Sequence, residues 1–127
     1  MFNTFCKKPL WECNRRLIRV AQGQEPADMV VRHATLVSVT THELLADADV
    51  AIADGRVAYL GLDGHTAEHC IGPETRLIDA AGAYVAPAFM DGHIHVESAM
   101  IGPSEYARAV VPHGTSGIYW DPHEAMN

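Results

Sequence analysis

The last third of the chain carries the pattern that most constrains its fold. Residues 88–96 form an apolar run that ends in polar side chains, and residues 115–124 repeat this pattern after an intervening segment. That segment, residues 102–114, has Pro103 near its start and Gly114 just past its end, as is typical of a short helix. Strand, helix and strand form the unit of a parallel α/β sheet, and such sheets bind ligands at the carboxyl ends of their strands.

The first of these expected strands ends in two histidines separated by one residue. Side chains alternate between the faces of a strand, so His93 and His95 point the same way and can bind one metal ion. Neutral imidazole suits zinc, iron, nickel or copper, and neighbouring carboxylates extend the range towards manganese. Glu97 shares the same face if the strand continues. Asp91 can orient a histidine by contacting it, without binding the metal itself.

Spacing alone does not decide in favour of a metal. With eight histidines in 127 residues, about 0.5 His-x-His pairs are expected by chance. Two hydrogen-bonded histidines at the end of a strand explain the pair equally well. His65 and His69 show an i, i+4 spacing, but they lie in a polar, turn-rich stretch, and we expect them to be surface residues rather than ligands.

The remainder of the chain is expected to be one helix followed by strands. Residues 9–22 have apolar positions at helical spacing. Two runs rich in β-branched residues follow, at 27–33 and 34–40. Asp54-Gly55 then separates two alternating apolar runs, which predicts a tight hairpin. Shorter strands are expected in 75–80 and 83–87.

Composition excludes several functional classes. A net charge of −7 without a basic run makes nucleic acid and anionic membranes poor partners. No apolar stretch approaches the roughly 20 residues of a membrane helix, and the first sixteen residues do not read as a secretory signal. Cys6, Cys13 and Cys70 are too few and too unevenly spaced for a disulfide framework, which favours a cytoplasmic location.

The sequence around the histidine pair resembles a known superfamily. "VAPAFMDGHIHVES", followed by a helix, "HGTS" and a second strand, is similar to the start of the amidohydrolases, with Ala88 where Gly often follows the proline. More specifically, "DGHIHVESAM", "EYARAVVPHGTS" and "WDPHEAMN" resemble the adenine deaminases of that superfamily. The resemblance extends from about residue 15 to the end of the chain.

The resemblance implies a fold, a reaction and a set of site residues. The fold would be mixed: a helical segment at 1–24, part of a composite β-sandwich domain at 25–86, and the first βαβ of a TIM-type (β/α)8 barrel at 87–127. The reaction would be hydrolysis of adenine, a small-molecule substrate, to hypoxanthine and ammonia, with manganese or iron as the expected metal and zinc as an alternative. His93 and His95 match the metal ligands, and the expected pocket or supporting residues are Asp91, Glu97, Asp121, His123 and Glu124.

A complete barrel of this type needs about 250 residues, and only about 40 follow Pro87. We therefore expect the chain to be an N-terminal portion of an adenine deaminase, inactive by itself and homo-oligomeric when complete. Two alternatives stay open. One is another cyclic amidohydrolase, of the dihydroorotase or hydantoinase type, and the other is a small β-rich protein without catalysis.

Overall fold

The computed structural model describes residues 8–121, which divide into two compact units. The first unit ends at Ala86 and the second begins at Pro87. The first contains a helix and a sheet, and the second contains a smaller sheet with its own helix. The chain is thus a mixed, sheet-rich structure with a few helices.

The first unit is built on five strands. Its elements are α1 (Leu10–Ala21), β1 (Met29–Ser38), β2 (Glu43–Ala53), β3 (Arg56–Gly61), η1 (Glu68–Cys70), β4 (Arg76–Asp79) and β5 (Tyr84–Val85). The strand order is β3-β2-β1-β4, and β5 also pairs with β1. β1 runs antiparallel to β2 and parallel to both β4 and β5. These strands form one mixed sheet, and the assignment of 25–86 to one half of a composite β-sandwich domain stays a prediction.

The hairpin expected at Asp54-Gly55 is confirmed. β2 and β3 are antiparallel, and the two residues between them have φ values of 50° and 68°. Positive φ at both positions matches the twist of the flanking strands, and glycine adopts it without steric cost.

The two β-branched runs at 27–33 and 34–40 lie in one continuous strand, β1. The register with β2 shifts between Val31 and Ala34, where His33 has a φ of 53°. The carboxylate of Asp49, which is buried, accepts hydrogen bonds from the N–H groups of His33 (3.2 Å) and Ala67 (2.8 Å). This irregularity bends the strand without ending it, so β4 pairs before it and β5 pairs after it.

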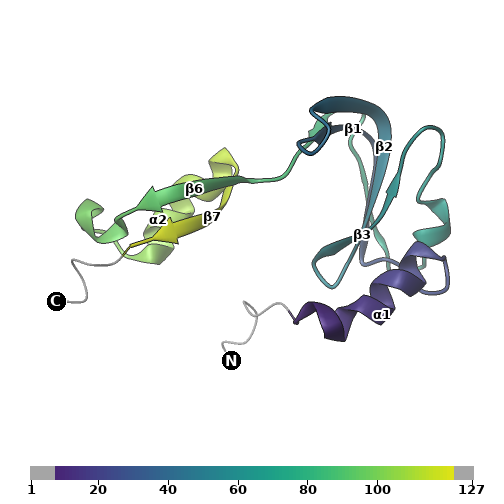
Figure 1. Ribbon diagram of the computed structural model, residues 1–127, viewed down its shortest axis with the longest axis horizontal. Helices are drawn as coiled ribbons and strands as arrows, with labels where there is room; N and C mark the ends of the chain where they lie inside the picture. The colour runs from purple at the N-terminus through teal and green to yellow at the C-terminus, as the bar shows by residue number, and fades with distance from the viewer. Residues whose placement is uncertain (1–7, 122–127) are drawn as a thin grey trace. The chain divides into compact units, whose positions relative to one another are not determined.

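Helix α1 matches the helix predicted for residues 9–22 and contacts β2 and β3 (Figure 1). Its apolar side provides Val20 to a cluster of small buried side chains. The other buried members of this core are Ala27, Val30, Ala51, Ala53, Ala67 and Cys70. The core is therefore formed between the helix, the sheet and the loop that contains η1.

The second unit is a strand-helix-strand unit, as the sequence predicts. Its elements are β6 (Phe89–Ile94), η2 (Val96–Ala99), α2 (Pro103–Val110), η3 (Val111–His113) and β7 (Thr115–Trp120). β6 and β7 pair in parallel, so their carboxyl ends lie at the same edge. The structure corrects one detail, because β6 ends at Ile94 and places His95 just beyond the strand.

No helix in residues 8–121 is both long enough and apolar enough to cross a membrane.

Candidate metal centre

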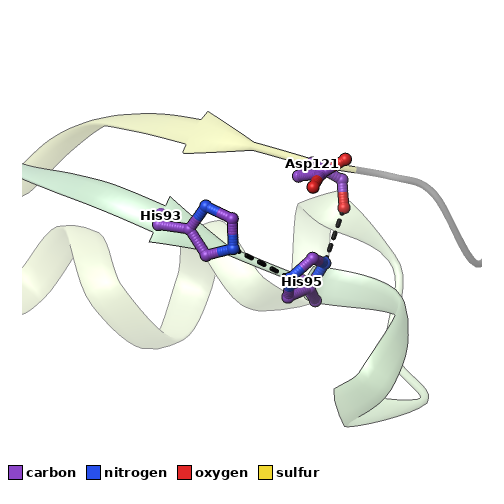
Figure 2. Close-up of side chains that lie close together, drawn as sticks. All are labelled: His93, His95 and Asp121. Carbon is purple, nitrogen blue, oxygen red and sulfur yellow. Dashed lines mark hydrogen bonds between the residues drawn. The ribbon is translucent and has the colours of Figure 1, made fainter.

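The two histidines of the His-x-His motif converge at the end of β6. Figure 2 shows their rings turned towards each other, with Asp121 at the end of the neighbouring strand β7. The Nε2 atoms of His93 and His95 lie 2.9 Å apart, and the ring planes are nearly perpendicular. His95 has an extended backbone, with φ −109° and ψ 89°, so its side chain keeps the direction expected for a strand.

This geometry fits two ligands of one metal ion. Nitrogen ligands lie about 2.0–2.1 Å from zinc, so two of them are separated by roughly 2.9–3.4 Å for bond angles between 90° and 110°. The separation of 2.9 Å between the Nε2 atoms falls within that range. The ligand atoms of His93, His95 and Asp121 all lie within 4.8 Å of one another, so a carboxylate is available as a third ligand.

The main chain of Asp121, which directly follows β7, determines which nitrogen of His95 carries the proton. Its Nδ1 lies 2.7 Å from the carbonyl oxygen of Asp121, which can only accept a hydrogen bond. Nδ1 therefore carries the proton, and the Nε2 of the neutral ring presents a lone pair towards His93. Either His93 donates its Nε2–H to that lone pair, or the Nε2 atoms of His93 and His95 both present lone pairs to a cation.

Asp91 supports His93 through the backbone. Its Oδ1 accepts the N–H of His93 at 3.1 Å, and its Oδ2 accepts the hydroxyl of Tyr106 at 3.2 Å. The sequence suggested that Asp91 orients an imidazole, whereas the bonds in the structure reach the main chain of His93 and helix α2. Desolvation of the phenol and its hydrogen bond to Asp91 raise the pKa of Tyr106.

Glu97 lies beside His95 and is fixed by a residue of β7. Its Oε1 is 3.8 Å from Nδ1 of His95, and its Oε2 accepts the indole N–H of Trp120 at 2.7 Å. The side chain is only 15% exposed. Glu97 lies in the short 3-10 helix η2. Of the two placements that the sequence allowed, in the strand or after it, the structure shows the second.

The other residues suggested by the sequence have mixed outcomes. Asp121 is placed with the histidine pair, while His123 and Glu124 lie outside the described residues. His65 and His69 are both exposed. His69 packs edge-on against Tyr59, and its Nε2 lies 3.1 Å from the carbonyl oxygen of Ala21. These contacts give His69 a structural role in joining the loop to the end of α1.

Sequence reasoning missed Trp120 and Tyr106. Both bring a polar group to a carboxylate next to the histidine pair. The available signal was their position, because Trp120 ends the second strand and Tyr106 lies in the connecting helix. Trp120 is 39% exposed and Tyr106 is half-buried, so only Tyr106 follows the rule that a covered Tyr or Trp finds a partner for its polar group.

Comparison with known proteins identifies close sequence relatives, although no family model matches the chain. An adenine deaminase of Clostridium botulinum is 58% identical over 127 residues, which are 100% of this chain and 20% of that protein. Adenine deaminases of Ruegeria pomeroyi and Rubrobacter xylanophilus are 49% and 50% identical over 120 and 121 residues. These matches cover 94% and 95% of this chain and 19% and 20% of the relatives.

Two solved structures share the fold at low sequence identity. Molinate hydrolase aligns with a TM-score of 0.56 at 19% identity, covering 76% of this chain and 24% of its own. A prolidase aligns with a TM-score of 0.52 at 20% identity, covering 72% of this chain and 25% of its own. The resemblance to adenine deaminases predicted from the motifs is confirmed by the sequence matches: the chain is similar to adenine deaminases over 94–100% of its length, and it spans about a fifth of the length of the curated relatives it matches.

Proposed function

We propose that this chain supplies the N-terminal part of a metal-dependent hydrolase that converts adenine to hypoxanthine and ammonia. The observation that carries the proposal is the 2.9 Å separation of the two Nε2 atoms at the end of a parallel strand. The names of the relatives support adenine as the substrate. The expected metal is manganese or iron, with zinc as an alternative, because the donor set combines imidazole with carboxylate.

In this mechanism, each residue of the chain has a limited task. His93 and His95 would hold the metal, and the exposed carboxylate of Asp121 lies close enough to take part. The main chain of Asp121 fixes the ring of His95, and Asp91 fixes the backbone at His93. When bound, the metal supplies Lewis-acid activation of water, lowering the pKa of that water to about 7.

The described residues supply only part of such a site. Catalytic metal sites usually have at least three protein ligands and an open position, and deamination also needs a group to protonate the departing amine. We propose that these groups come from further βα units of a TIM-type barrel that begins with β6, α2 and β7, while the first unit belongs to a composite β-sandwich domain. The complete protein would be a soluble, cytoplasmic homo-oligomer.

The test is complementation with the remainder of a relative. Residues 1–127 of this chain would be joined in frame to the portion of the Clostridium botulinum adenine deaminase that follows the matched segment. Adenine loss, followed by ultraviolet absorbance with manganese, should occur in the joined protein and not in the 127-residue chain. A His93→Ala version should be inactive, and a His65→Ala version, altered at an exposed histidine, should retain activity.

Three results would overturn the proposal. Full activity after His93→Ala would remove the histidine from the site. If the joined protein folds and hydrolyses dihydroorotate or hydantoin but not adenine, the result would favour the cyclic amidohydrolase alternative. If the joined protein folds but binds no metal and has no hydrolytic activity, the result would favour the alternative that this chain is a non-catalytic protein.

A further inference from the structure

The hydrogen bond between Trp120 and Glu97 lies next to the histidine pair and is not used in the mechanism above. The indole N–H, which is a donor only, points to Oε2 of Glu97 at 2.7 Å. The other carboxylate oxygen, Oε1, is 3.8 Å from Nδ1 of His95. One carboxylate thus lies between an indole on β7 and a candidate metal ligand just after β6.

Both ends of this contact are attached to fixed elements. Glu97 follows Val96, whose side chain is fully buried and anchors the turn η2. Trp120 is paired with Ile94 in the parallel sheet, and the next N–H, that of Asp121, donates to the carbonyl of Ile94 at 3.1 Å. The indole therefore approaches Glu97 from a backbone that two sets of main-chain contacts hold in register.

We propose that Trp120 is a positioning residue, whose indole N–H holds the Glu97 carboxylate beside His95 and thereby strengthens divalent-metal binding by the histidine pair. The inference rests on the metal site of the proposed function and assigns a role to a residue outside its ligands.

The chemical reason is the charge of the carboxylate. A metal-binding histidine commonly has its second ring nitrogen next to a carboxylate or carbonyl, which fixes the ring and increases its basicity as a ligand. Here the carbonyl of Asp121 takes the hydrogen bond from Nδ1, and Glu97 adds a negative charge at 3.8 Å in a mostly buried position. Without the indole N–H, that carboxylate would lose the hydrogen bond that Trp120 gives it, which is one of the contacts that keep it beside His95.

A purely structural role for Trp120 makes a different prediction. If the ring matters only through its packing, Trp120→Phe should preserve metal affinity, since the phenyl ring keeps an apolar contact but has no N–H. Glu97→Gln complements this change, because the amide oxygen can still accept from the indole while the negative charge is lost. Trp11, 79% exposed on α1, provides a matched control for replacing a tryptophan.

The experiment measures Mn²⁺ binding to the 127-residue chain by nuclear magnetic resonance. Paramagnetic broadening of the His93 and His95 ring protons gives a dissociation constant specific to this site. We expect Trp120→Phe and Glu97→Gln each to weaken Mn²⁺ binding by about tenfold. The double variant should be no weaker than Glu97→Gln alone, because Trp120 acts through Glu97, and Trp11→Phe should bind like the unaltered chain. The indole N–H resonance of Trp120, but not that of Trp11, should shift in Glu97→Gln.

Different outcomes of this experiment would overturn the role of Trp120 and the metal site of the proposed function. Unaltered affinity in Trp120→Phe, or additive losses in the double variant, would overturn the role of Trp120 alone. If Trp120→Phe does not fold, Glu97→Gln decides, and unchanged affinity in that folded variant overturns the inference. Absence of any Mn²⁺ effect on His93 and His95 in the unaltered chain would overturn the metal site itself, and with it both proposals.

Discussion

Arg16 of helix α1 and Asp28, which precedes β1, form a two-pronged ion pair. Nη2 of Arg16 lies 2.6 Å from Oδ1 of Asp28, and Nη1 lies 3.1 Å from Oδ2. The same Oδ2 accepts the N–H of Asp54 in the hairpin turn at 2.7 Å. The hydrogen bonds from Arg16 and Asp54 hold the pKa of Asp28 below its ordinary value. A single carboxylate thus ties the helix to two parts of the sheet.

The first prediction concerns the pH dependence of this contact. Arg16→Gln should lower the free energy of unfolding at pH 7 by about 0.5–1 kcal/mol, because the pair is largely exposed. The pKa of Asp28 is lower in the folded state, so its contribution is present above about pH 3.9 and is lost as the pH falls through the folded value. In urea unfolding, the difference in unfolding free energy between Arg16→Gln and the unaltered chain should be smaller at pH 3 than at pH 7. Arg15→Gln, exposed on the same helix, should have little effect at either pH.

The second prediction concerns Gly61, at the end of β3. A Cβ at this position would overlap the backbone carbonyl oxygen of His65, which cannot move as a flexible side chain can. Gly61→Ala should therefore destabilise the protein by more than about 2 kcal/mol. Gly64→Ala is the matched comparison, since its Cβ would meet nothing, but its φ of +82° carries a conformational cost of about 1 kcal/mol. Equal thermal stability of the two variants would contradict the overlap.

The third prediction concerns metal content. Replacing both His93 and His95 with Ala should strongly reduce bound metal, because the site then loses both imidazole ligands and, of the three groups that residues 8–121 bring together, keeps only Asp121. Elemental analysis after dialysis against manganese or zinc would measure this in the joined protein described above. The His65→Ala variant should keep its metal. Full metal content in the double variant would place the ion elsewhere.

The fourth prediction concerns the second unit. Its sheet has two strands and leaves Phe89, Met90 and Tyr119 exposed, whereas β1 has strands on both sides. Two-stranded sheets are marginally stable, so amides of β6 and β7 should exchange with solvent about tenfold or more faster than those of β1 and β2. Hydrogen exchange of the 127-residue chain would test this. Strong protection of residues 115–120 in a monomer would contradict it.

Local patterns predicted the elements well because their causes are local. The hairpin at Asp54-Gly55 requires two residues that tolerate positive φ, and the sequence displays them. The continuity of β1 through His33 was not predictable in this way, since it depends on the distant carboxylate of Asp49. The same limit applied at the site. The spacing of His93 and His95 indicated their convergence, but the contact between Trp120 and Glu97 joins residues that become neighbours only when β6 and β7 pair.

The way in which the main chain of Asp121 holds His95 has a consequence for sequence variation. The bonds to Ile94 and His95 are made by the N–H and C=O of residue 121 and do not depend on its side chain. Any residue other than proline supplies both groups. A substitution at residue 121 would therefore change the carboxylate beside the candidate metal site while leaving the hydrogen bond that directs the His95 ring in place.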